Sequence, residues 1–183
     1  MFANLFGKKE PGNEEHLFKD RAYMNTRAKM QACAVLAKDD KSTLFIAWFV
    51  ETAKQFRNYF VENGISESRV IEARQLHTAQ LAEHQPVFVE HYPMHSKEEA
   101  FVQHWEQKNI LVYSAMDEPL FRHFGSDKII PMMKLMGMKE NEVIEHQLVS
   151  KSIIKGQQKI EEQVSLEQAA ASQAEWMERN LKQ

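Results

Sequence analysis

Histidine is the residue type in this chain with the widest chemical scope, because imidazole can act as a general acid or base and can bind a metal. Six of the eight histidines lie in the middle of the chain: His77, His84, His91, His95, His104 and His123. His91 and His95 are the best candidates for metal ligands, because they flank the end of a predicted strand. Glu90 beside His91 is a candidate acid–base pair.

Other features of the sequence argue against this histidine chemistry. No HExxH motif occurs, and no aspartate lies between residues 41 and 116 to complete a ligand set. The pattern therefore favours surface and edge histidines with no bound metal. A histidine-dependent metal enzyme on the same scaffold remains the alternative function.

Motifs for nucleophilic catalysis and nucleotide binding are missing from the sequence. Cys33, the single cysteine, excludes an internal disulfide and a cysteine zinc cage, and its alanine neighbours on a predicted helix indicate a small core residue. There is no GxSxG elbow, no GxxxxGK[ST] phosphate loop and no GxGxxG after a strand. We therefore expect no cofactor.

A methionine cluster follows a Gly-Ser-Asp turn, at Met132, Met133, Met136 and Met138. Three interpretations are open: a soft-metal site, an adaptable protein-binding groove, and flexible filling of an irregular core. Neighbouring isoleucine and leucine residues favour core packing. Met132 and Met136 are also candidates for contact with a protein partner.

The elements that would position these residues alternate between strands and helices. Four short apolar runs predict strands over 43–49, 69–73, 86–92 and 109–115. Helical patterns cover 14–38, 50–63, 75–84 and 96–108, the last with Ser96 as N-cap and Glu99 completing a capping box. The alternation predicts an α/β fold with a mostly parallel sheet of about four strands flanked by helices.

The C-terminal part of the chain has a different pattern. Two short helices are predicted between residues 116 and 137, each ending in a glycine. Beyond Asn141 no proline occurs, and one long amphipathic helix is predicted, with Gly156 as a weak point. Its apolar stripe is the candidate surface for a protein partner or for homo-oligomer formation: Ile144, Leu148, Ile153, Ile160 and Val164.

These patterns predict a flexible tail over 1–13, an α/β domain over 14–138 and a long helical extension over 139–183. The formal net charge of −3 gives no general attraction to nucleic acid. No signal peptide and no apolar stretch of about 20 residues is present, so we expect a cytoplasmic protein without stable membrane insertion.

One long stretch, "LFRHFGSDKIIPMMKLMGMKENEVIEHQLVSKSIIKGQQKIEEQ", resembles the end of the second motor domain of the SecA preprotein translocase ATPase and the start of its helical scaffold. The matching positions are Phe124, Gly125, Ser126, Asp127, Lys128, Ile129, Gly137, Ile144, Glu145, His146, Val149, Lys151, Ile153, Gln157, Lys159 and Glu161. Upstream, a "Y..T.AK" pattern is similar to the helix that leads into that domain: Tyr23, Thr26, Ala28 and Lys29. The resemblance covers about residues 22–165.

The resemblance implies a RecA-like domain of the P-loop NTPase type, related to helicase C-terminal domains, with a scaffold-type helix after it. SecA-type ATPases also need a first motor domain with a phosphate loop, and arginine fingers in the second. Between residues 85 and 109 this chain has no arginine, so no catalytic residue can be carried over. The resemblance implies a degenerate, non-catalytic SecA-like protein that acts through protein–protein interaction, with a translocase component or itself as partner.

Overall fold

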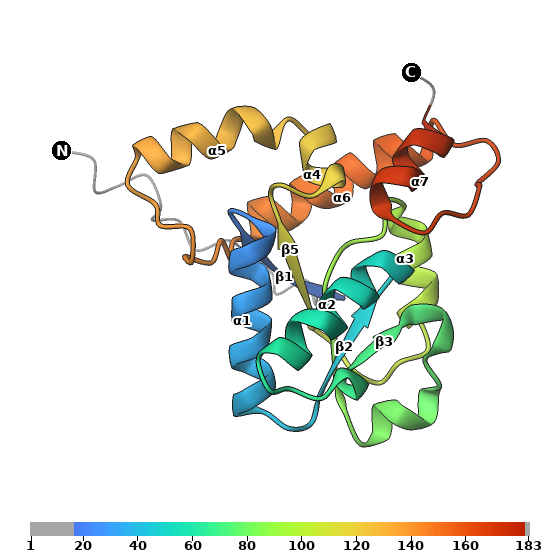
Figure 1. Cartoon of the computed structure of the whole chain (residues 1–183). Coiled ribbons are helices and arrows are strands. Elements are labelled where there is room, and N and C mark those ends of the chain that lie inside the picture. Colours follow the sequence, from blue (N-terminus) through green and yellow to red (C-terminus); the bar gives the residue numbers. More distant parts are fainter. Residues whose placement is uncertain (1–16, 182–183) are drawn as a thin grey trace, which may run out of the picture.

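A five-stranded sheet forms the centre of the computed structural model, which describes residues 17–181 (Figure 1). The strands are β1 (Phe18–Tyr23), β2 (Thr43–Ala47), β3 (Val70–Glu72), β4 (Gln85–Phe88) and β5 (Ile110–Ala115). They lie in the order β1-β5-β4-β2-β3, and every neighbouring pair is parallel. The predicted α/β class with a parallel sheet is confirmed, with five strands instead of four. The predicted tail over 1–13 lies outside the described residues.

The additional strand is β1, which falls where the sequence predicted the first half of a helix. It pairs with β5 along its whole length, from Phe18 opposite Ile110 to Tyr23 opposite Ala115. The helix α1 (Thr26–Asp39) begins only afterwards, where the Asn25 side chain accepts a hydrogen bond from the Ala28 N–H (2.9 Å). Pairing with the sheet thus outweighs a helical spacing that continues through this segment.

Helices cover both faces of the sheet. On one face, α1 and α2 (Val50–Glu62) bury Cys33, Phe56 and Phe60 against the strands. On the other face, α3 (His95–Val102) packs with two short 3-10 turns, Ala73–Gln75 and Thr78–Ala82, which replace the predicted helix over 75–84. A further 3-10 turn, Glu67–Arg69, precedes β3.

The predicted start of α3 is wrong by a small margin. The helix begins at His95 with Met94 as N-cap, and the Ser96 capping box does not form. The Ser96 hydroxyl instead donates a hydrogen bond to Glu161 in the C-terminal part of the chain. A tertiary contact has therefore taken over the side chain that the local pattern assigned to capping.

A third apolar layer covers the carboxyl end of the sheet. It is built from α4 (Pro119–His123), α6 (Gln147–Glu161) and α7 (Gln173–Asn180), which surround the fully buried Trp176. The single long helix predicted over 139–183 is wrong, because α6 ends at Glu161 and a loop precedes α7. The Ser172 side chain caps α7, and the Ala171 carbonyl accepts a hydrogen bond from the Glu51 N–H (3.0 Å) at the start of α2. These tertiary contacts outweigh the high helix propensity of the alanine-rich loop.

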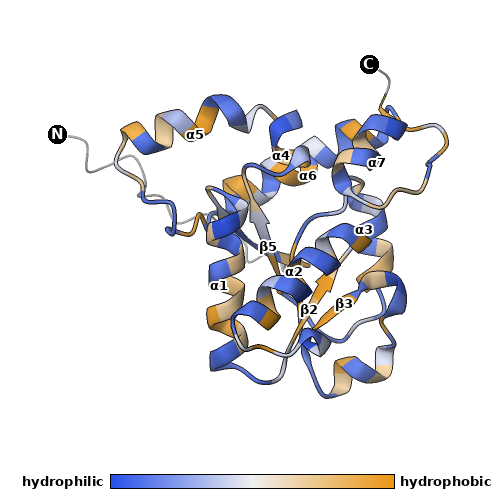
Figure 2. Ribbon diagram, in the orientation of Figure 1, coloured by the Kyte–Doolittle hydropathy of each residue, from blue (hydrophilic) through white to orange (hydrophobic). Residues whose placement is uncertain are grey.

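The helix α5 (Ser126–Leu135) extends away from the sheet and the other helices (Figure 1). Met132 is 63% exposed, Leu135 90% and Met136 85%, so the prediction that the methionine cluster fills a core is wrong for these residues. Figure 2 shows hydrophobic residues along this helix. None of the helices in the described residues is long and apolar enough to span a bilayer.

Candidate functional site

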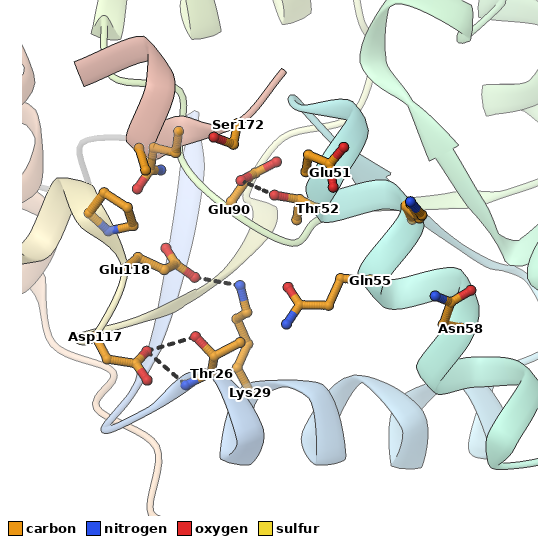
Figure 3. Close-up of a pocket in the computed structure, with 14 residues that line it drawn as sticks. Thr26, Lys29, Glu51, Thr52, Gln55, Asn58, Glu90, Asp117, Glu118 and Ser172 are labelled. Carbon is orange, nitrogen blue, oxygen red and sulfur yellow. Dashed lines mark hydrogen bonds and ion pairs between the residues drawn. The ribbon is translucent and has the colours of Figure 1, made fainter. Parts of the chain in front are cut away.

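In open α/β sheets, ligands bind at the carboxyl ends of the strands. The binding crevice forms at the point between two neighbouring strands whose following helices pack on opposite faces of the sheet. In this chain the point lies between β2 and β4, because β2 continues into α2 on one face and β4 into α3 on the other. A cavity of about 570 Å³ opens there, between α1, α2 and the residues after β5 (Figure 3). This cavity is the candidate functional site.

Glu90, which follows β4, links the ends of β2 and β4 inside the cavity. Its Oε1 accepts hydrogen bonds from the N–H groups of Trp48 (2.9 Å) and Phe49 (3.0 Å), and its Oε2 accepts one from the Thr52 hydroxyl (2.8 Å). Phe49 is the N-cap of α2 and has no capping side chain, so Glu90 supplies acceptors at that helix start.

The pKa of Glu90 is shifted into the neutral range. Burial raises it to about 7, although Lys29 and the Thr52 hydroxyl act in the opposite direction. The Glu90 carboxyl group can therefore take up or release a proton near pH 7.

Lys29 is the buried cation of the cavity. Its Nζ donates a hydrogen bond to the Val89 carbonyl (2.6 Å) and forms an ion pair with Glu118, which also accepts a hydrogen bond from the Ala115 N–H (3.0 Å). Burial alone would lower the pKa of Lys29, but the Glu118 carboxylate outweighs burial and raises it. The positive charge of Lys29 is thus neutralised by a partner within the protein.

Two further sets of hydrogen bonds fix the cavity walls. The N–H and the hydroxyl of Thr26 both donate to Asp117, at 2.8 and 2.7 Å. Gln173, at the start of α7, accepts a hydrogen bond from the Leu120 N–H (2.8 Å) and donates one to the His91 carbonyl (3.0 Å). The loop and helix that end the described chain therefore complete the site.

The cavity has a negative balance of charge. Its lining includes four carboxylates and two ammonium groups: Glu51, Glu90, Asp117 and Glu118 with Lys29 and Lys54. Among its described lining residues none is an arginine. Phosphoryl transfer requires fixed positive charge at the reacting phosphate, and Lys29 is already paired. The lining is therefore better suited to a neutral or cationic polar group than to a polyphosphate.

Glu90 and His91 do not form the acid–base pair that the sequence suggested, because the two side chains have separate sets of partners. The Nε2 atom of His91 lies 2.9 Å from Asp20, and its Nδ1 atom lies 3.1 Å from Glu98. Burial opposes protonation, yet Glu98 and Asp20 raise the pKa of His91 well above its ordinary range. His91 is thus a buried imidazolium that joins β1 to α3.

Of the other candidate histidines, His95 shares Glu98 with His91, at 3.9 Å from its Nδ1 atom, and His84 lies elsewhere. His95 lies 3.3 Å from Glu99, and the His84 ring lies 3.1 Å from the Ser42 carbonyl. The remaining three are exposed on separate elements: His77, His104 and His123. Within residues 17–181, no group of three or more His, Cys, Asp or Glu side chains could hold a metal ion.

The predicted interaction residues divide into exposed and buried sets. Exposed are Leu148, Met132 and Met136; partly buried are Ile144 and Val164; buried are Ile153 and Ile160. The two buried isoleucines pack with α4 and α7, so the apolar stripe of α6 is used largely within the chain itself. Ile144 exchanges two backbone hydrogen bonds with Ala22 on the outer edge of β1 (3.0 and 2.8 Å).

Comparison with known proteins gives one consistent relationship. Over 49 residues the chain is 51% identical to the protein translocase subunit SecA of Acidithiobacillus ferrooxidans. It is 45% identical over 53 residues to SecA of Chlorobium phaeobacteroides, and 45% identical over 49 residues to SecA of Acinetobacter baumannii. The chain contains a SecA-related segment. No family model matches it.

The extent of these matches is limited. Each covers 27–29% of this chain and 5% of the SecA protein concerned, so the chain spans a small fraction of the length of its curated relatives. The resemblance inferred from the residue pattern is confirmed over a stretch of this size.

The ion pairs of the cavity were not predicted as a site. Lys29, Glu90 and Glu118 are far apart in the sequence and carry no local spacing that would link them. The one available signal was the SecA-like "Y..T.AK" pattern, which contains both Thr26 and Lys29 of the cavity wall.

Proposed function

We propose that this chain is a non-catalytic SecA-related protein that acts through protein–protein contacts in preprotein translocation. The SecA-related segment supports the link to translocation. The observation that carries the interaction role is an exposed apolar surface on α5. The partner we propose is a SecA protein of the translocase.

The exposed surface, here called the α5 ridge, consists of Met132, Leu135 and Met136. Their spacing of i, i+3 and i+4 places them on one side of the helix, and all three are more than 60% exposed. Methionine and leucine side chains in a helical row form an adaptable apolar surface for a partner helix or groove. Exposing such a row to water is unfavourable, which favours a bound state in which it is covered.

The chemistry of the cavity supports the non-catalytic part of the proposal. Lys29 is neutralised by Glu118, and the remaining lining is dominated by carboxylates. A triphosphate placed there would meet repulsion from Glu90 and Asp117. We therefore expect the chain to lack the electrostatic stabilisation that an ATPase needs.

A direct test is to measure ATP turnover and nucleotide affinity with the purified chain, with an intact SecA protein as positive control. No turnover and no binding at micromolar ATP are expected. Turnover, or micromolar affinity, would show that the chain retains a working nucleotide site and would refute the non-catalytic role.

The interaction role is tested at the α5 ridge. The double variant Leu135→Asp/Met136→Asp should weaken capture of purified SecA by about tenfold or more, since charged groups would replace the centre of the contact. Binding would be measured by biolayer interferometry with the Acinetobacter baumannii protein.

A matched control is Val35→Asp/Val61→Asp, which changes two exposed apolar side chains on α1 and α2. This control should bind SecA as the unmodified chain does. Equal loss of binding in both double variants would contradict a docking role for α5. Unchanged SecA affinity of the ridge variant would contradict it as well. Light scattering of the unmodified chain would reveal self-association instead.

A further inference from the structure

A second apolar surface lies on the opposite side of α5 from solvent, between this helix and α6. It is a groove of about 490 Å³, here called the α5–α6 groove, and its walls are almost entirely apolar. The lining residues used below are Met116, Phe124, Ile129, Met133, Leu148 and Val149. Ile129 is 47% exposed and Leu148 60% exposed, so the groove is open along its rim.

We propose that the start of this same chain, residues 2–6, docks in the α5–α6 groove. The sequence there is Phe-Ala-Asn-Leu-Phe, with apolar side chains at Phe2, Leu5 and Phe6. This i, i+3, i+4 spacing is that of a helical turn with one apolar side, the pattern that amphipathic segments present to apolar grooves. Residues 1–16 lie outside the described part of the chain.

The position of Leu17 brings these residues within reach of the groove. Leu17 borders a neighbouring cavity together with Ser150, Ile153 and Ile154 of α6. The α5–α6 groove is lined by Leu148, Val149, Ser152 and Ile153 of the same helix, so Ile153 borders both. Leu17 therefore lies beside the same part of α6 that continues into the groove wall.

The linker is long enough for this path. The residues between Phe6 and Leu17 number ten in the sequence. A fully extended chain of that length spans roughly 33 Å. Tethering by such a short linker gives an effective concentration on the order of millimolar, so even weak intrinsic affinity would keep the segment docked.

This inference is independent of the SecA-binding proposal, because the two surfaces use different residues. The α5 ridge is formed by Met132, Leu135 and Met136, whereas the groove uses Ile129 and Met133. A docked N-terminal segment would cover the exposed side of Leu148 and leave the ridge free for a partner.

Paramagnetic relaxation of methionine methyl groups provides the test. Cys33 is fully buried, so the variant Asn4→Cys can be labelled with a nitroxide at that position alone. In the full chain we expect strong broadening of the methyl signals of Met116 and Met133, which line the groove. Met30, which is buried in the core that α1 and α2 form with the sheet and does not line the groove, should be unaffected and serves as the internal control.

Two substitutions separate docking from a folding defect. Leu5→Asp/Phe6→Asp changes only the N-terminal segment and should abolish the broadening, while the methyl spectrum of the rest stays unchanged. Leu148→Asp at the groove rim should reduce the broadening of the Met116 and Met133 signals at least about fivefold. Leu135→Asp on the ridge should leave this broadening unchanged. Absence of selective broadening in the unmodified background would overturn the proposal.

The same label identifies the competing occupant. A mixture of nitroxide-labelled chain without isotope and isotope-labelled chain without nitroxide should show no broadening. Broadening in that mixture would mean that the segment docks on a second copy, which would also overturn docking within one chain.

Discussion

At the scale of single residues, the main finding is a set of buried charges at the carboxyl edge of the sheet. Glu90 caps the start of α2, Lys29 is paired with Glu118, and His91 lies between Asp20 and Glu98. Removing one member of such a pair leaves an uncompensated buried charge, which is more costly than losing a surface ion pair.

Glu90 makes the folding stability depend on pH in a predictable direction. Its pKa rises from 4.5 to about 7 on folding, so the unfolded chain loses this proton first as the pH increases. The stability associated with protonated Glu90 is therefore complete below about pH 4.5 and is lost as the pH rises through 7. The shift corresponds to about 3 kcal/mol.

The variant Glu90→Gln should remove this dependence. Free energies of unfolding from urea titrations at pH 4.5–8 would show a smaller decline in the variant than in the unmodified chain. Glu67→Gln, at an exposed position, is the control and should retain the decline. Parallel pH profiles for Glu90→Gln and the unmodified chain would contradict the assigned pKa.

At the scale of elements, the packing of α4 and the following residues against α6 depends on a single glycine. A Cβ atom built at Gly156 would lie 2.4 Å from the Phe124 ring, closer than packed atoms can approach. The sequence pattern marked Gly156 as a weak point in a helix. The structure instead shows a position of close contact, where the missing side chain allows the ring to lie against the helix.

Gly156→Ala should accordingly destabilise the chain by about 1–3 kcal/mol through overpacking. In a helix without this contact, the same substitution would stabilise by about 1 kcal/mol. The sign of the measured change therefore shows whether the Phe124 ring packs against Gly156. The measurement is urea-induced unfolding followed by circular dichroism.

Lys155→Ala, at the exposed neighbouring position, should change stability by only a few tenths of a kcal/mol. Adding Phe124→Leu to Gly156→Ala should recover part of the loss, because the smaller side chain can move away from the new methyl group. A stabilising effect of Gly156→Ala alone would show that the ring does not rest on this helix in solution.

At the scale of the whole molecule, the C-terminal residues are part of the same packed body as the sheet. Trp176 of α7 is fully buried, donates a hydrogen bond to Glu167 (2.9 Å) and packs edge-on against Tyr92 after β4. The predicted division at residue 138 treated this region as a separate helical extension.

Trp176→Ala should lower the free energy of unfolding of the entire chain by about 3–5 kcal/mol, because a large cavity replaces the indole. Far-ultraviolet circular dichroism and the fluorescence of Trp48 and Trp105 should report one common transition in the unmodified chain and in the variant. Glu178→Ala on the exposed side of α7 is the control. A variant in which the sheet keeps its full stability would indicate that α7 unfolds independently.

Local patterns predicted those parts of the fold that depend on local information. The apolar runs at 43–49 and 109–115 predicted strands, and β2 and β5 lie there. The strand β1 was missed because its sequence includes Lys19, Asp20 and Arg21, and the buried Asp20 carboxylate lies 2.9 Å from His91, a contact that no local pattern predicts. The break between α6 and α7 was missed because burial of Trp176 outweighs helix propensity. In both places, contacts between residues far apart in the sequence determine the secondary structure.

The order of the strands has a consequence for synthesis of the chain. Within the sheet β1 pairs only with β5, and Phe18 lies opposite Ile110, which is 92 residues later in the chain. Residues leave the ribosome in order, so β1 emerges long before the strand that it must join. Pairing over such a distance is slow in any case, because the intervening chain has to be ordered first. We therefore expect β1 to join the sheet only after β5 has been synthesised.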